Sequence, residues 1–372
     1  MSQVQKGLEG VIADTTSISL VDGEAGQLYY RGYPVESLVQ HPFAAVANLI
    51  LFGELPDARR LAEIEEFLWN AGRLPAATAQ ILRELARQGA HPMATLQAIL
   101  PLLGFEPPET SLTQPAEMRE GLVIASRIPA AIASIFATIE GRPEHPYPES
   151  RRYGERYLAL LHGRTPSAEE VEAFECMQIL QLDHGFNAST FTARVVTSTL
   201  APVSSALSAA MGALYGPLHG AADQGALEMA LEVGHPDVAD KFVEECLRTG
   251  KRVLGMGHRE YRVVDPRSKV MMAMARKIAT QPEHDRLFET LSAVESAFVE
   301  RTAAKRRALR ANMEFYKGVV FLALGIPKEL FTATFAASRV FGWVAHTIEQ
   351  RKDNRIIRPA ALYVGPLPRD DQ

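Results

Sequence analysis

"LFETLSAVESAFVERTAAKRRAL", residues 287–309, is the stretch that indicates the kind of fold this chain adopts. Apolar side chains recur in it at steps of three and four residues, at Leu287, Leu291, Val294 and Phe298. Such steps place the apolar side chains on one face of an amphipathic helix, because an α-helix turns once in about 3.6 residues. Similar spacing recurs through most of the chain, and it predicts an all-α fold class.

One segment near the start departs from this pattern. "SISLVDGEAGQLYYRGY", residues 17–33, has two short β-type runs on either side of Asp22-Gly23. An Asp-Gly pair between two such runs is a hairpin signal. The chain is therefore predicted to be mainly α with a small N-terminal β-hairpin, and its helices to be joined by glycine- and proline-rich loops.

The composition is that of a globular protein and excludes several function classes. The chain has 372 residues, of which 47% are hydrophobic and 22% charged, so it is long enough for a large core and two domains. The net charge is −5 and the sequence pI about 6.1. Without a global positive field, neither nucleic acid nor an anionic membrane is expected as a partner, and an anionic ligand must be bound by local basic groups.

The cysteines and the apolar segments indicate a cytoplasmic location. Cys176 and Cys246 form no CxxC pair and no disulfide framework, which fits a reducing compartment. The polar N-terminus "MSQVQKGLEG" lacks the apolar core of a signal peptide. The most apolar run, residues 128–139, is expected to be too short to span a bilayer.

Three histidines lie in contexts marked by glycine or aspartate: His184 in "QLDHGFNASTF", His219 in "YGPLHGAADQG" and His258 in "GMGHREYRVVDPR". Taken singly, each fits a structural role. Together they predict a ligand site, because an imidazole flanked by glycine can be approached without obstruction by neighbouring side chains. A metal site is the competing use of clustered histidines, but the chain has neither HExxH nor a short His-x-His spacing, so no metal is predicted.

The position of His219 predicts its protonation state. It lies just before an alanine-rich run that is expected to be helical. A helix N-terminus presents backbone N–H groups and the positive end of the helix dipole, which disfavour an imidazolium. His219 is therefore expected to be a neutral imidazole that donates one hydrogen bond.

Four arginines accompany the histidines. Arg262 and Arg267 follow His258 by four and nine residues, whereas Arg339 and Arg358 lie within apolar runs. Each is open to interpretation as an ordinary solvated charge. For the latter two, however, burial of an unpaired guanidinium would be costly, so a carboxylate or phosphate partner is expected.

Five segments, in order and spread over residues 7–366, together resemble the citrate synthase family in its shorter bacterial and archaeal form. They are "GLEGVIADTTSISLVDGEAGQLYYRGY", "LDHGFNASTFTARVVTSTL", "GPLHG", "GMGHREYRVVDPR" and "NRIIRPAALYVG". The resemblance implies a two-domain helical fold: a large, dimer-forming domain of residues 1–219 and 321–372, and a small domain of residues 220–320 that closes over the active site. It also implies a homodimer or a hexamer.

The resemblance implies an acyltransferase that condenses acetyl-CoA with oxaloacetate and hydrolyses citryl-CoA to citrate and CoA. No tightly bound cofactor is expected, since acetyl-CoA is a co-substrate. By resemblance, His219 hydrogen-bonds the thioester carbonyl and stabilises the enol, His258 polarises the oxaloacetate carbonyl, and Glu314 takes the α-proton.

The resemblance also assigns the binding residues. His184 helps to hold oxaloacetate, and its carboxylates are bound by Arg267, Arg339 and Arg358, the last from the partner subunit. For the acyl-CoA, Arg262 is expected to contact the CoA phosphates. Gly255 and Gly257 are expected to give the CoA close access to the backbone.

The chain departs from the family pattern inside three site segments. In "ANMEFYKG", residues 311–318, Glu314 stands where the family has Asp and Lys317 where it has Ser. Two further departures are Gln181 in place of His and the residues after "GPLHG", which are Ala221, Ala222, Asp223 and Gln224 rather than Gly-Ala-Asn-Glu.

Two alternatives stay open: a 2-methylcitrate synthase that uses propionyl-CoA, and a catalytically weakened paralogue with a binding or assembly role. A Lys317–Glu314 salt bridge would favour the weakened paralogue.

Overall fold

Helices dominate the computed structural model, as the periodicity predicts. It describes residues 4–105, 107, 112, 114–220, 222–303 and 309–366; Ala221 is outside them, and residues 222 and 223 are described by their backbone alone. The α-helices are α1 (Val35–Leu38), α2 (Phe43–Phe52), α3 (Ala58–Ala71), α4 (Ala76–Arg87), α5 (Pro92–Ile99), α6 (Ala116–Ile139), α7 (Tyr153–His162), α8 (Ala168–Leu180), α9 (Ala188–Ser198), α10 (Val203–Tyr215), α11 (Ala222–Val233), α12 (Ala239–Thr249), α13 (Pro266–Ile278), α14 (Pro282–Thr302), α15 (Met313–Ala323) and α16 (Phe331–Lys352).

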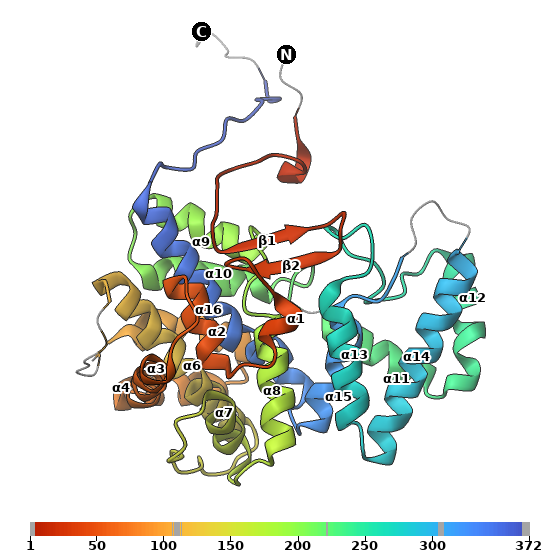
Figure 1. Cartoon of the computed structure of the whole chain (residues 1–372), viewed down its shortest axis with the longest axis horizontal. Coiled ribbons are helices and arrows are strands. Elements are labelled where there is room, and N and C mark those ends of the chain that lie inside the picture. The colour runs from red at the N-terminus through yellow and green to blue at the C-terminus, as the bar shows by residue number, and fades with distance from the viewer. Residues whose placement is uncertain are drawn as a thin grey trace.

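The predicted hairpin is present and carries a third short strand. Strands β1 (Ser19–Asp22), β2 (Gln27–Tyr30) and β3 (Tyr33–Pro34) form an antiparallel sheet in the order β1-β2-β3. The tip of the hairpin docks on the loop before α13, where the Arg262 backbone N–H donates to the Gly23 carbonyl at 2.8 Å. A Cβ at Gly23 would overlap the Glu260 carbonyl, so this close approach requires glycine. Figure 1 shows the hairpin reaching from the α9–α10 side of the molecule towards α13.

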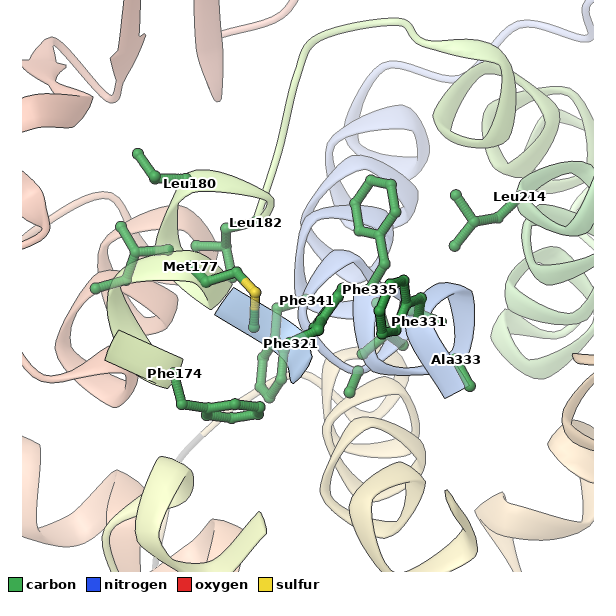
Figure 2. Close-up of a cluster of buried hydrophobic side chains, with 14 of the residues drawn as sticks. Phe174, Met177, Leu180, Leu182, Leu214, Phe321, Phe331, Ala333, Phe335 and Phe341 are labelled. Carbon is green, nitrogen blue, oxygen red and sulfur yellow. The ribbon is translucent and has the colours of Figure 1, made fainter. Parts of the chain in front are cut away.

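Helix α16 lies at the centre of the core. Nearly all of its side chains are buried, and it packs against α2, α6, α9 and α10. A helix that is apolar all round has to be surrounded by other helices. Figure 2 shows Phe331, Phe335 and Phe341 of this helix among Phe174, Met177 and Leu214 from its neighbours. The buried side chains of this helix also include polar ones, among them Arg339 and His346.

Helix α6 corrects one sequence-based expectation. The apolar run of residues 128–139 is only its second half, and the whole helix is long and apolar enough to cross a membrane by length and composition. However, 78% of its most apolar window is buried inside the protein. The buried part of α6 begins before residue 128, because small residues such as Gly121 extend the face that packs on α16. A Cβ at Gly121 would overlap the side chain of Val344 on α16. Its burial is that of a core helix.

Helices α11–α15 pack chiefly against one another and lie together on one side of the molecule (Figure 1). The loop between α12 and α13 is held to the start of α15 by a β-bridge between Met256 and Ala311. The Asn312 backbone N–H also donates to the Gly255 carbonyl at 2.9 Å. The division into domains at residues 220 and 320 stays a prediction.

Candidate active site

A cavity of about 750 Å³ brings together residues from segments far apart in the sequence. It is lined from the hairpin, from the loop before α9, from the loop before α11, from the loop before α13, and from α15 and α16. Seven of the ten residues expected to form the site line it: His184, His219, Gly257, His258, Arg267, Glu314 and Arg339.

His219 meets the N-terminus of α9. Its Nε2 accepts the Ser189 backbone N–H at 3.3 Å and lies 2.8 Å from the Ser189 hydroxyl. Ser189 is in the first turn of α9, whose N-cap is Asn187, so the imidazole lone pair meets a backbone donor that has no acceptor within the helix. With Nε2 as acceptor, the single proton of the neutral ring is on Nδ1.

The neutral state expected of His219 is confirmed, with a different principal cause. Burial lowers its pKa to about 4; the charge of Arg339 and, more weakly, that of Lys317 act in the same direction, while Glu314 opposes them. The direction expected from the sequence is therefore right, and its largest cause is desolvation.

We expect His219 to make the protein less stable in acid. The unfolded pKa near 6.5 exceeds the folded value of about 4, so between these pH values the unfolded state binds more protons and stability falls as the pH is lowered. From pH 7 to pH 5 the free energy of unfolding should fall by about 2 kcal/mol through this residue. Denaturant unfolding at both pH values would show a smaller loss for His219→Gln. The matched control, His41→Gln at an exposed position, should leave the loss unchanged; an equal loss in all three proteins would contradict the assignment.

His258 and Arg267 direct two donors towards one place. The His258 Nδ1 accepts the Glu260 backbone N–H at 3.0 Å, so in the neutral ring the proton is on Nε2. An Nη2 of Arg267 lies 3.4 Å from that Nε2. Because both groups are then donors, an oxygen atom between them would accept from both.

A buried carboxylate fixes Arg267. Asp265 accepts from its Nε at 3.0 Å and from its Nη2 at 2.8 Å, and both side chains are buried. Burial alone would raise the pKa of Asp265, but the charge and hydrogen bonds of Arg267 outweigh it and lower the pKa. Asp265 also caps α13, so the arginine is held at a defined place on a helix start.

Arg339 is buried beside the cavity. Its Nε donates to the Gln181 carbonyl at 2.6 Å, and its guanidinium lies 4.7 Å from the ring centroid of Phe335. In the part of the chain that the structure describes, no carboxylate forms an ion pair with it. Burial lowers its pKa, and the more distant charge of Asp183 opposes this. An anion bound in the cavity would supply the missing partner.

His184 completes this side of the cavity. Its Nε2 lies 3.1 Å from the Tyr261 hydroxyl, and its ring centroid is 5.3 Å from that of His258. Burial, followed by the charges of Arg267 and His258, holds its pKa well below the usual range. His184 is therefore a neutral group among cations.

Glu314 faces the cavity from the first turn of α15, where the helix dipole favours a carboxylate. Its backbone N–H donates to the N-cap Asn312 at 2.9 Å. One carboxylate oxygen forms an ion pair with the fully buried Nζ of Lys317, one helical turn later. The salt bridge considered from the sequence is therefore present.

Arg262 and Gly255, which were expected in the site, do not line the cavity, and neither does Arg358, which was expected to reach it from the partner subunit. Arg262 is exposed, and both its backbone N–H and its side chain face the hairpin turn, where its Nε lies 3.6 Å from a Glu24 carboxylate oxygen. Gly255 serves packing: its φ is +78°, and a Cβ there would lie 2.8 Å from the Phe315 ring. Arg358 is exposed on the segment after α16, because its apolar neighbours do not pack against the core of this chain.

Sequence reasoning missed two arginines and an asparagine. Arg252 and Arg259 line the cavity from the same loop as His258, and Asn312 lines it from the N-cap of α15. The Asn312 side chain donates to the Gly257 carbonyl at 2.9 Å, so it fixes the loop that carries His258. An Asn two residues before the expected base is a helix-cap signal that could have found it. Across the described residues, no cluster of three or more His, Cys, Asp or Glu is placed to hold a metal ion.

Comparison with known proteins gives one family. Residues 7–360 match the family model described as citrate synthase, C-terminal domain. Citrate synthase 2 of Bacillus subtilis is 34% identical over 97% of this chain and 96% of its own length. The 2-methylcitrate synthase of Shewanella oneidensis is 36% identical over 98% of this chain and 95% of its own length.

Solved structures agree with the sequence relatives. A citrate synthase of Thermoplasma acidophilum, in a ternary complex with carboxymethyl coenzyme A and oxaloacetate, superposes with a TM-score of 0.91 at 31% identity and covers 100% of this chain and 98% of its own. The citrate synthase of Pyrobaculum aerophilum gives 0.87 at 34% identity, over 98% and 93%. With the match to the family model over nearly the whole length, the chain belongs to the citrate synthase family, transferases that condense acetyl-CoA with oxaloacetate.

Proposed function

We propose that this chain is an active citrate synthase whose reaction takes place in the cavity of His219, His258 and Glu314. The observation that carries the proposal is their convergence there with two buried arginines, Arg267 and Arg339. A carboxylate base, two imidazole donors and a cationic surround are the groups that an enolisation followed by addition to a ketone requires.

The proposed steps follow from the hydrogen bonds. Glu314 takes a proton from the methyl carbon of acetyl-CoA, while the Nδ1–H of His219 donates to the thioester oxygen and stabilises the enol. The Nε2–H of His258 donates to the ketone oxygen of oxaloacetate. The enol carbon then bonds to the ketone carbon as the ketone π bond opens, and the ketone oxygen gains a proton through the His258 Nε2–H donor to become the hydroxyl of citryl-CoA. Water adds to the citryl thioester and CoA leaves as its thiol, which gives citrate and CoA.

The substrate-binding roles are proposed on the same ground. Arg339, which has no counter-ion among the described residues, and the outer edge of Arg267 would bind the carboxylates of oxaloacetate, with His184 beside them. For the CoA phosphates we propose Arg252 and Arg259 in place of Arg262, because they line the cavity. Because the protein has a net negative charge, a polyanion such as CoA needs local cations of this kind to bind.

Steady-state turnover tests this function. We expect CoA release that requires oxaloacetate, with a higher kcat/KM for acetyl-CoA than for propionyl-CoA. A higher kcat/KM for propionyl-CoA would instead support a 2-methylcitrate synthase, the activity named for the Shewanella oneidensis relative. Calorimetric binding of oxaloacetate with no CoA release from either thioester would overturn the proposal in favour of a weakened paralogue.

We further propose a cytoplasmic homodimer in which Arg358 enters the partner's site. Its support is the segment after α16, where Leu362, Tyr363 and Val364 are more than two-thirds exposed on the single chain. Subunits with Arg358→Ala mixed with subunits carrying His258→Ala should regain activity, because some mixed dimers then contain one complete site. Mixed dimers with no more activity than their parents would contradict a shared site, and cell fractionation would test the location.

A further inference from the structure

Three departures from the family pattern meet in one buried cluster. Gln181 at the end of α8, Glu314 in the first turn of α15 and Lys317 one turn later are in contact, although 136 residues separate the outer two. Their contact shows that these substitutions form one structural unit.

Lys317 is the centre of this cluster. Its side chain is fully buried, and its Nζ pairs with a Glu314 carboxylate oxygen and donates to the Gln181 Oε1 at 3.2 Å. The same Nζ lies 4.4 Å from the ring centroid of Phe335 on α16. A buried ammonium is tolerated only where anions, acceptors and aromatic faces replace water, and here three helices supply them.

The cluster reaches the residue proposed to bind oxaloacetate. Two cations lie near the ring of Phe335: the Nζ of Lys317 is 4.4 Å and the guanidinium of Arg339 is 4.7 Å from the ring centroid. Gln181 also contacts both cations. Its side-chain oxygen accepts a hydrogen bond from Lys317, and its backbone carbonyl accepts one from the Arg339 Nε at 2.6 Å. The ammonium beside Glu314 and the guanidinium of Arg339 are therefore held by the same two residues.

The extra length of the Glu314 side chain explains why its contact with Lys317 matters. Compared with aspartate, glutamate has one more methylene and one more torsion, so its carboxylate can occupy more positions. A fixed ammonium on one carboxylate oxygen selects one position, while the carboxylate still faces the cavity. Displacement of a base by about 1 Å can cost about 100-fold in rate.

We propose that Lys317, held by Gln181 and Phe335, is a positioning residue that sets the place of the Glu314 carboxylate relative to the bound acyl group. The inference rests on the proposed function of Glu314 as the base. When Glu314 has taken the proton and is neutral, the ammonium keeps its acceptor on Gln181 and the face of Phe335. Its charge therefore stays solvated throughout the step.

Lys317→Met, which keeps the length of the side chain and removes the charge, tests the proposal. We expect kcat to fall about 10- to 100-fold, with the KM of both substrates changed less than about threefold, because the base is displaced and the binding residues are not. Lys328→Met, at an exposed ammonium near Glu228, is the matched control and should keep the parent kcat. If Lys317→Met does not fold, Gln181→Leu leaves the ion pair in place and should give a smaller fall in kcat alone.

A double-mutant cycle separates positioning from a general structural role. Glu314→Asp shortens the side chain and draws the carboxylate away from the ammonium of Lys317. We expect this change to lower kcat about tenfold in the parent but less than about twofold in the Lys317→Met background. If the parent enzyme turns over, an equal fall in kcat from Glu314→Asp in both backgrounds would overturn the inference, and so would an unchanged kcat in Lys317→Met. A parent enzyme without turnover would overturn the proposed function instead.

Discussion

Glu314→Gln is expected to lower kcat for acetyl-CoA and oxaloacetate by about 1000-fold, the middle of the usual range for loss of a general base. The amide keeps the shape of the side chain and cannot take the α-proton. Oxaloacetate affinity should change little, because the proposed carboxylate ligands Arg267 and Arg339 are untouched. Steady-state kinetics and calorimetry with oxaloacetate would measure the two effects separately.

The matched control is Glu329→Gln, at an exposed glutamate outside the cavity, which should keep the parent kcat. A Glu314→Gln enzyme as fast as the parent would show that another group removes the proton. A large loss of oxaloacetate affinity would show that the substitution disturbs the site as a whole. This second result would also count against the proposal that Gln181 and Phe335 hold the buried ammonium of Lys317 when its partner is neutral.

Arg267→Gln is expected to have the largest effect on stability. It leaves the carboxylate of Asp265, which is 2% exposed, without its cation. Removing one partner of a buried ion pair costs about 3 to 5 kcal/mol of unfolding free energy. The same change removes a proposed ligand of oxaloacetate, so the loss of stability and the loss of binding need to be separated.

The double variant Arg267→Gln with Asp265→Asn makes that separation. Asparagine keeps a cap for α13 and carries no charge, so most of the lost stability should return in denaturant unfolding. Oxaloacetate affinity in calorimetry should stay low in both variants, because the guanidinium is absent from both. Return of affinity together with stability would show that Arg267 only supports the fold.

The buried Lys317–Glu314 pair bears on the choice between an active enzyme and a weakened paralogue. From the sequence, the salt bridge argued for loss of function, because a paired carboxylate is a weaker base. In the structure the ammonium is also held by Gln181 and Phe335, and Glu314 keeps its place in the lining of the cavity. A fixed partner of this kind fits an active enzyme in which the substitutions at Gln181 and Lys317 accommodate a glutamate base.

Local patterns were sufficient for the secondary structure and for the types of residue in the site. The step of three and four residues in 287–309 predicted α14, and the Asp22-Gly23 hairpin signal predicted β1 and β2. Both signals depend on neighbours within about one turn, which the sequence displays directly. The histidines were found in the same way, because a glycine next to an imidazole is a local feature.

The sequence by itself thus determined the helical class, the hairpin and the histidines of the site, while the tertiary structure alone decided which charged groups face the cavity. Arg267 lines it and Arg262 does not, although both follow His258 closely; Arg339 lines it and Arg358 lies outside the cavity of its own chain, although both are within apolar runs. It also decided that Lys317 meets a glutamine 136 residues away. The physical reason is that periodicity arises from adjacent turns, whereas the burial and partners of a long charged side chain depend on which distant helix packs against it.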